Sequence, residues 1–182
     1  MPTWTPIVGK AFSTEQFDQY VHSLSWTDWK PSFLVLHNTA DPTLADIPNG
    51  FTSHNMDGFV RYYRDDQHWS AGPHLFCDDH QIWVFTPLTK CGVHSPSWNK
   101  VAFGCEMLGD YATEDFASGR GFAVRQNAES AIAILCHAMG WAPDNFRLHK
   151  EDPLTTHVCP GKNVIKDEVI AGIAALLGPD AG

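Results

Sequence analysis

Two stretches decide the fold and the chemistry of this chain: FLVLHNTA at residues 33–40 and LHKEDPLTTHVCPG at residues 148–161. The first begins as a continuous apolar run, which is typical of a strand buried on both faces of a sheet. It ends in His37, and the second stretch offers His149 and Cys159 in a loop. Two imidazoles and a thiolate suit zinc, and three protein ligands leave a fourth position open for water. An open zinc site of this kind points to hydrolysis.

Each of these three residues also has an ordinary explanation when it is taken alone. A histidine at the end of a strand commonly makes only structural hydrogen bonds. The occurrence of His37, His149 and Cys159 together at the ends of expected elements is what favours a metal site. One alternative ligand set replaces His149 with His157, which lies two residues before Cys159.

Composition limits the class of protein. The chain has 182 residues, 43% of them hydrophobic and 18% charged, which fits one domain with a substantial core. Its net charge of -9 disfavours a nucleic-acid partner, because nucleic-acid binding needs a basic face. No apolar run reaches the roughly 18 residues that span a bilayer, so we expect no membrane insertion.

The beginning of the chain, residues 1–10, lacks a charged segment followed by an apolar run. We therefore expect no signal peptide and cytoplasmic synthesis. We also expect a monomer with a single domain over residues 1–182, whose core covers about residues 31–177. Of the five cysteines, Cys77, Cys105 and Cys136 lie in apolar runs, where buried free thiols are expected. The odd number and the spacing do not support a disulfide framework.

Hydrophobic periodicity predicts alternating strands and helices. The expected helices cover residues 14–24, the region of 56–63, residues 122–139 and residues 163–177. The expected strands are residues 33–36, a hairpin over 74–85 and residues 101–108. This alternation predicts an α/β fold: a single domain in which helices flank a central mixed β-sheet.

Five pieces of the chain, spread from about residue 31 to residue 164, form a joint pattern of order and spacing. They are LHNTA at 36–40, GPHLF at 72–76, GVHS at 92–95, FGCEMLG at 103–109, and residues 149–161. In this pattern the chain resembles the zinc-dependent N-acetylmuramoyl-L-alanine amidases of the type 2 amidase family. That family includes phage lysozyme-like amidases, bacterial anhydromuramyl amidases and animal peptidoglycan recognition proteins.

The resemblance implies a set of metal ligands and a catalytic base. His37, His149 and Cys159 would hold Zn²⁺, with water as the fourth ligand. Glu106 matches a catalytic glutamate of the bacterial members and would take a proton from the attacking water. Without the resemblance, Glu106 reads as a surface carboxylate on a half-exposed strand. Partial burial would raise its pKa toward that of a useful base.

The sequence departs from the family at two positions. His157 stands where many relatives carry a catalytic lysine, and the resemblance gives it the role of stabilising the oxyanion. Histidine, unlike lysine, loses its positive charge near neutral pH, so we expect activity to fall as His157 deprotonates. Pro73 stands where phage relatives place a tyrosine that contacts the catalytic water. Proline cannot make this contact, so the resemblance leaves the activation of the water mainly to Glu106.

Other residues are assigned to the surroundings of the site. His94 and Trp98 lie in a loop expected to border the cleft, and we assign them to substrate binding; ordinary loop packing is the alternative. His74 is expected near the metal in a structural role. Asn38 and Thr39 are expected to support the metal ligands.

The function implied is hydrolysis of the amide between N-acetylmuramic acid and L-alanine of peptidoglycan, by a zinc-activated water. A phage or prophage endolysin and an enzyme that recycles soluble muropeptides both fit this composition. One rival is a non-catalytic peptidoglycan-binding module, which the intact set of three ligands disfavours. Another rival is a zinc peptidase that cuts within the stem peptide.

Overall fold

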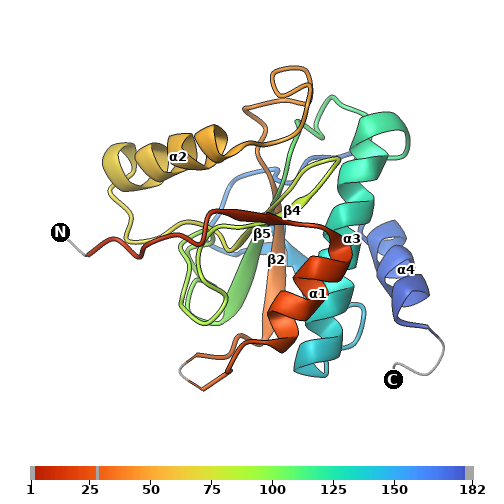
Figure 1. Cartoon of the computed structure of the whole chain (residues 1–182). Coiled ribbons are helices and arrows are strands. Elements are labelled where there is room, and N and C mark those ends of the chain that lie inside the picture. The colour runs from red at the N-terminus through yellow and green to blue at the C-terminus, as the bar shows by residue number, and fades with distance from the viewer. Residues whose placement is uncertain (1–2, 28, 179–182) are drawn as a thin grey trace.

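The structure is a computed structural model that describes residues 3–27 and 29–178. Its described residues form one α/β domain with six strands, four α-helices and two short turns of helix (Figure 1). In chain order these elements are β1 (Lys10–Phe12), α1 (Thr14–His22), β2 (Phe33–Asn38), α2 (Ser53–Arg61), the π-helical turn η1 (Tyr62–Asp66), β3 (Leu75–Cys77), β4 (Ile82–Val84), β5 (Ala102–Met107), α3 (Gly119–Met139), β6 (Phe146–Leu148), the 3-10 turn η2 (His149–Glu151) and α4 (Lys166–Leu177).

The strands form one mixed sheet, as the sequence predicts, and their order is β1-β4-β3-β5-β2-β6. β3, β5, β2 and β6 run parallel to one another, whereas β4 and β1 are antiparallel to their neighbours. The carboxyl ends of the parallel strands therefore meet at one edge, which is where open α/β sheets place their ligands. In this register His37 lies opposite Glu106, and Leu36 lies opposite Leu148.

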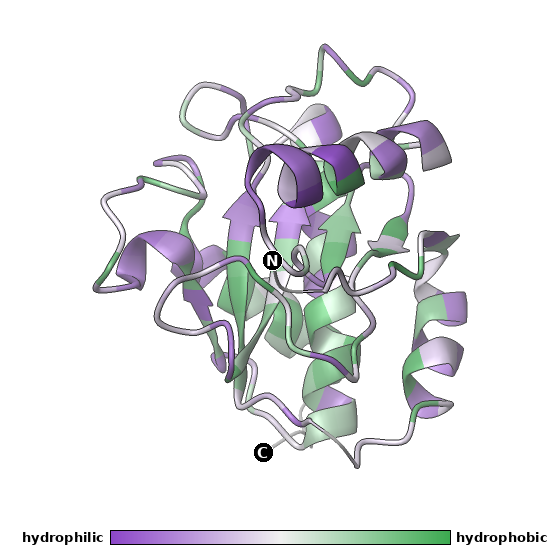
Figure 2. Ribbon diagram, turned by 90° about the vertical axis from the view of Figure 1, so that its left-hand side faces the viewer, coloured by the Kyte–Doolittle hydropathy of each residue, from purple (hydrophilic) through white to green (hydrophobic). Residues whose placement is uncertain are grey.

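Helices cover both faces of this sheet. α3 contacts α1, α4 and the strands β3, β4 and β5, whereas α2 lies on the other side of the sheet (Figure 1). The central strands are largely hydrophobic, and some of them become hydrophilic toward the arrowhead (Figure 2). One apolar stripe of the long helix α3 is buried throughout: Val124, Ala128, Ala131, Ile132, Leu135 and Met139.

Most predicted elements are confirmed, with shifts at their ends. α1 begins with a capping box, in which the Ser13 hydroxyl accepts from the backbone N–H of Gln16 at 3.2 Å. α3 ends at Gly140, whose φ of 69° is the left-handed conformation that glycine adopts readily. The last helix begins at residue 166 rather than 163. β1 and β6 were not predicted, because three residues are too few to show a period.

The three cysteines expected in the core are buried and free, as predicted: Cys77, Cys105 and Cys136. Within the described part of the chain, no helix combines the length and the apolar character that crossing a membrane requires.

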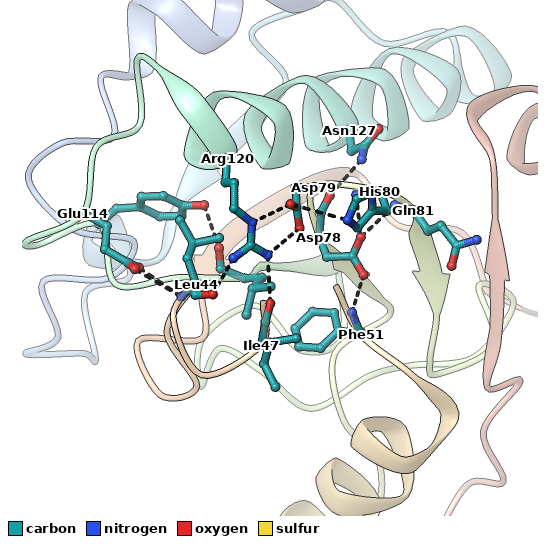
Figure 3. A network of polar contacts seen from close by, with 12 residues as sticks. Leu44, Ile47, Phe51, Asp78, Asp79, His80, Gln81, Glu114, Arg120 and Asn127 are labelled. Atoms are coloured by element: carbon teal, nitrogen blue, oxygen red, sulfur yellow. Dashed lines mark hydrogen bonds and ion pairs between the residues drawn. The ribbon is translucent and has the colours of Figure 1, made fainter. Parts of the chain in front are cut away.

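A polar network fixes the long connection between β2 and α2, residues 39–52 (Figure 3). Arg120 of α3 donates to both carboxylate oxygens of Asp79, at 2.6 and 2.9 Å, and to two carbonyl oxygens of the connection. The neighbouring Asp78 accepts from the backbone N–H of Phe51 at 2.7 Å. The hairpin turn and α3 together hold this connection beside the carboxyl edge of the sheet.

Hydrogen bonds to the buried carboxylate of Asp152 hold the loop that follows β6. Asp152 is 1% exposed, and its carboxylate accepts from the hydroxyls of Ser95 and Ser97, both at 2.5 Å, and from the backbone N–H of Leu154 at 2.9 Å. Burial alone would raise the pKa of Asp152, but the hydrogen bonds outweigh burial and hold the pKa at about 2. These hydrogen bonds therefore connect the loop around residues 93–99 to the loop that reaches Cys159.

We expect Asp152→Asn to lower the free energy of unfolding by about 2 kcal/mol at pH 7, because the amide loses charged hydrogen bonds in a buried place. The folded-state pKa lies below the unfolded one, so this contribution is complete above about pH 4 and is lost as the pH falls toward 2. Urea unfolding of both proteins at several pH values checks this.

The matched control for this prediction is Asp46→Asn, an exposed aspartate whose side chain bonds only to Thr43. The control should change stability much less than Asp152→Asn does, as is usual for surface substitutions. A difference between wild type and Asp152→Asn that stays constant down to pH 2 would contradict the assignment.

Candidate metal centre

The structure brings together the three residues that the sequence singled out. His37 lies near the end of β2, His149 directly follows β6, and Cys159 lies in the next loop. One ligand atom from each lies within 4.8 Å of the others. The Cys159 Sγ is 3.8 Å from the Nδ1 of His37, and the ring centroids of the two histidines are 4.3 Å apart. Parallel pairing of β2 with β6 produces this approach, because it places the residue after Leu148 beside His37.

The chemistry of these donors fits a divalent cation. The Nε2 of His149 is buried and has no hydrogen-bond partner among the described residues. Burial, and then the charge of Glu106, raise the pKa of the Cys159 thiol, so a thiolate here needs a neighbouring positive charge. The backbone N–H of Asn38 already donates to the Sγ at 3.4 Å, as a thiolate would require. Two histidines and one cysteine form a donor set typical of zinc.

The ring nitrogen of His37 that faces away from Cys159 is hydrogen-bonded to His94, which is not one of the candidate ligands. Its Nε2 lies 3.2 Å from the Nδ1 of His94, and the Nε2 of His94 lies 3.1 Å from the carbonyl oxygen of Ala102. Burial is the main cause that lowers the pKa of His94 to about 3, and it also lowers the pKa of His37 well below its usual value. Both rings are therefore neutral at pH 7. His94 lines the cleft as predicted, but neither of its ring nitrogens is left for a substrate hydrogen bond.

The carboxyl group of Glu106 lies close to the ligand group. It lies opposite His37 in the parallel register, and its Oε1 is 4.0 Å from the Nδ1 of His37. Its side chain is 12% exposed, and burial raises its pKa to about 8. A carboxylate with a raised pKa, on the same face as the ligand group, is a suitable general base.

His157 lies beside the ligand group rather than in it. Its side chain is exposed, and its ring stacks on that of His149 with centroids 5.6 Å apart. Among the described residues, the group that could hold a metal contains His149 and not His157. The alternative ligand set is therefore not the one that the fold assembles, and His157 is left free to face a substrate.

Two cavities meet at this group. The larger, about 630 Å³, extends toward α2 and η1, and the smaller, about 370 Å³, extends toward the loops around residues 93–99 and 154–157. Four residues line both cavities: Trp69, His94, His149 and His157. An elongated substrate can therefore pass over the ligand group with one arm in each cavity.

Trp98 does not reach this cleft. Neither cavity is lined by it, and its ring packs edge-on against Phe33 at 5.6 Å and beside the guanidinium of Arg147 at 5.2 Å. These contacts favour the packing alternative for Trp98, and its assignment to substrate binding stays a prediction that neither cavity supports. The loop turns so that His94 points toward the site while Trp98 points toward β2 and β6.

The hydrogen bonds of three further residues show their surroundings: His74, Asn38 and Thr39. The Nδ1 of His74 accepts from the backbone N–H of Gly104 at 3.0 Å, and its Nε2 lies 2.9 Å from the carbonyl oxygen of Lys90. Its role is structural, as expected. Asn38 contacts Cys159 through its backbone, whereas the hydroxyl of Thr39 bonds to backbone atoms of neighbouring loops.

Sequence reasoning missed the aromatic wall of the larger cavity. Tyr63 reads in the sequence as part of a helical apolar stripe, but η1 places it in the cavity lining, stacked on Trp69 with ring centroids 5.2 Å apart. Burial, and then the charge of Glu106, raise the pKa of Tyr63 well above its usual value. Its hydroxyl therefore stays protonated. The available signal was Trp69, a large aromatic residue in a segment without regular structure.

Solved structures share this fold at low sequence identity. The endolysin N-acetylmuramoyl-L-alanine amidase LysCS from Clostridium intestinale is 22% identical, with a TM-score of 0.61 over 82% of this chain and 90% of that one. A mutant endolysin from Bacillus subtilis is 24% identical, with a TM-score of 0.57 over 81% and 88%. A mutant of Drosophila PGRP-LB in complex with tracheal cytotoxin is 18% identical, with a TM-score of 0.62 over 79% and 83%.

A match to a family model is more specific than the shared fold of these structures. No curated protein sequence matches the chain at a significant level. The model of the N-acetylmuramoyl-L-alanine amidase family (Amidase_2), in contrast, matches residues 27–162, which include the three candidate ligands and Glu106. By this match, the chain belongs to the N-acetylmuramoyl-L-alanine amidase family.

Proposed function

We propose that this chain hydrolyses the amide between N-acetylmuramic acid and L-alanine with a zinc ion held by His37, His149 and Cys159. The observation that carries the proposal is the convergence of these three donors beside the buried carboxyl of Glu106, where two cavities meet. When bound, zinc would polarise the scissile carbonyl and lower the pKa of water to around 7.

Glu106 acts as the proton carrier in this proposal. Its carboxylate takes a proton from the attacking water and delivers it to the departing amine of L-alanine. Two features support this role. The register places Glu106 directly opposite His37, and burial raises its pKa to about 8, which makes it a stronger base than an exposed glutamate.

His157 stabilises the negative oxygen that forms at the scissile carbonyl. It is exposed, lines both cavities and stacks on His149. A substrate with one arm in each cavity would therefore pass beside its ring. A protonated imidazole donates a charged hydrogen bond, which is the kind of interaction that strengthens as the oxygen becomes negative. The same site would serve an endolysin that attacks the wall or an enzyme that recycles soluble muropeptides.

The proposed reaction is tested on purified protein with a defined muropeptide. We expect one zinc per chain and two products: an intact muramic sugar and a peptide with a free L-alanine amino terminus, identified by mass spectrometry. Cys159→Ser and His149→Ala should lose both zinc and turnover, because two remaining protein ligands hold the ion poorly. His54→Ala, on the exposed surface of α2, is the matched control.

The other outcomes separate the rival functions. Stoichiometric zinc without any cleavage would identify a binding module and overturn the amidase proposal. Cleavage within the stem peptide would identify a peptidase instead. Comparison of intact peptidoglycan with soluble muropeptides, each at matched amide concentration, shows which form of the substrate the cleft accepts.

We expect Glu106→Gln to lower kcat by about 10²–10⁴-fold, the usual contribution of a positioned general base. Zinc content should not change, because Glu106 is not among the three ligands. Steady-state kinetics and metal analysis of the same sample check both parts. Glu15→Gln, at an exposed position in the first turn of α1, is the matched control. Turnover within a few-fold of wild type would remove Glu106 from the mechanism.

Replacement of His157 tests the oxyanion role separately. We expect His157→Ala to lower kcat by about 10²-fold, with zinc retained. His157→Lys should keep most of the turnover, because lysine offers a charged hydrogen-bond donor at the same place. Steady-state kinetics and metal analysis of the three proteins provide the measurement. Full turnover in His157→Ala, or equal losses in His157→Ala and His157→Lys, would show that the assignment is incorrect.

A further inference from the structure

The ring of His94 occupies a place that only glycine at position 104 leaves open. A Cβ atom at Gly104 would lie 2.4 Å from the Cγ of His94, well inside any permitted contact. Gly104 pairs with Val35 in the parallel register, two residues before the pair of Glu106 with His37. The ring of His94 therefore lies against the face of β5 that carries Glu106, within reach of His37.

The partners of His94 decide which of its nitrogens carries a proton. The carbonyl oxygen of Ala102 can only accept, so the Nε2 of His94, 3.1 Å away, is the N–H donor. In the neutral ring, the Nδ1 then holds a lone pair and must accept. The atom it faces, at 3.2 Å, is the Nε2 of His37. This nitrogen of His37 therefore carries the proton.

The remaining nitrogen of His37 is left with its lone pair. It is the Nδ1, which lies 3.8 Å from the Sγ of Cys159 and 4.0 Å from the Oε1 of Glu106. His37 is 2% exposed and His94 is 6% exposed, so water does not compete for these hydrogen bonds. Two buried hydrogen bonds in series thus turn the free electron pair of His37 toward the ligand group.

We propose that His94 is a positioning residue that fixes His37 in the Nε2–H tautomer, so that His37 binds the metal through Nδ1. The consequence for zinc rests on the proposed function, whereas the tautomer itself does not. A carboxylate or a carbonyl is the usual partner of a ligating histidine. Here the partner is a neutral imidazole, which orients His37 without adding a further buried acidic group beside Glu106 and Cys159.

The backbone around His94 is held as firmly as its ring. The side-chain oxygen of Asn99 accepts from the backbone N–H groups of His94 and Ser95, at 2.7 and 2.8 Å. The hydroxyl of Ser95 in turn donates to Asp152. The position of the ring is therefore set from both ends: by Gly104 and Ala102 beneath it, and by Asn99 and Asp152 at its backbone.

The first test reads the tautomers in metal-free protein by long-range ¹H–¹⁵N NMR of the histidine rings at pH 7. We expect both His37 and His94 to be neutral and protonated at Nε2. A His37 ring protonated at Nδ1, or a His94 ring protonated at both nitrogens, would overturn the proposal. Because no metal is needed, this result stands even if the protein proves not to bind zinc, which would count against the proposed function alone.

The second test measures zinc affinity by competition with a chelator. His94→Leu fills the space but cannot accept a hydrogen bond, and we expect it to weaken zinc binding by about 10–100-fold. His94→Asn places a side-chain oxygen where the Nδ1 stood, so it should bind zinc within a few-fold of wild type. His54→Leu, on the exposed surface of α2, is the control for loss of a histidine.

Two results of the second test would contradict the proposal. One is wild-type affinity in His94→Leu, and the other is equal weakening in His94→Leu and His94→Asn. Thermal unfolding of the metal-free variants establishes that they are folded before affinities are compared. If His94→Leu does not fold, the comparison of His94→Asn with wild type and the NMR result decide the question. Gly104→Ala, which displaces the ring, should weaken zinc binding as His94→Leu does.

Discussion

The parallel pairing of β2 with β5 on one side and β6 on the other is the constraint on which the site depends. It brings His37 opposite Glu106 and places His149 directly after the residue that pairs with Leu36. Side chains alternate between the faces of a strand, so a slip of one residue would turn His37 to the opposite face. The hydrophobic residues that bury both faces of β2 fix this register, and the chemistry follows from it.

Burial gives the site its electrostatic character. It lowers the pKa of His37 and His94 and raises the pKa of Glu106 and Cys159, so the folded protein favours the uncharged form of each group. A divalent ion would reverse this balance in two ways: it releases the proton of the thiol, which is one of its ligands, and its positive charge favours the ionised form of the nearby carboxyl. The ionised carboxylate of Glu106 would then lie beside the metal and could act there as a general base.

The loops around the site are held by buried carboxylates rather than by apolar packing alone. Asp152 ties the loop that carries Cys159 to the loop that carries His94. Asp78 and Asp79, with Arg120, fix the connection that follows His37. These contacts suit a site whose walls are irregular segments, since hydrogen bonds impose the precise geometry that apolar contacts do not.

The sequence by itself determined the elements with a clear hydrophobic period, such as the long helix predicted over residues 122–139, and the three candidate ligands at the ends of elements. It could not show β1 or β6, because three residues carry no period, nor that His94 faces His37 while Trp98 turns away. Those depend on contacts between distant parts of the chain, such as His37 with His94, 57 positions apart, which only the folded sheet brings together. Local sequence sets propensity and pattern, whereas tautomer, pKa and cavity lining depend on neighbours that only tertiary structure supplies.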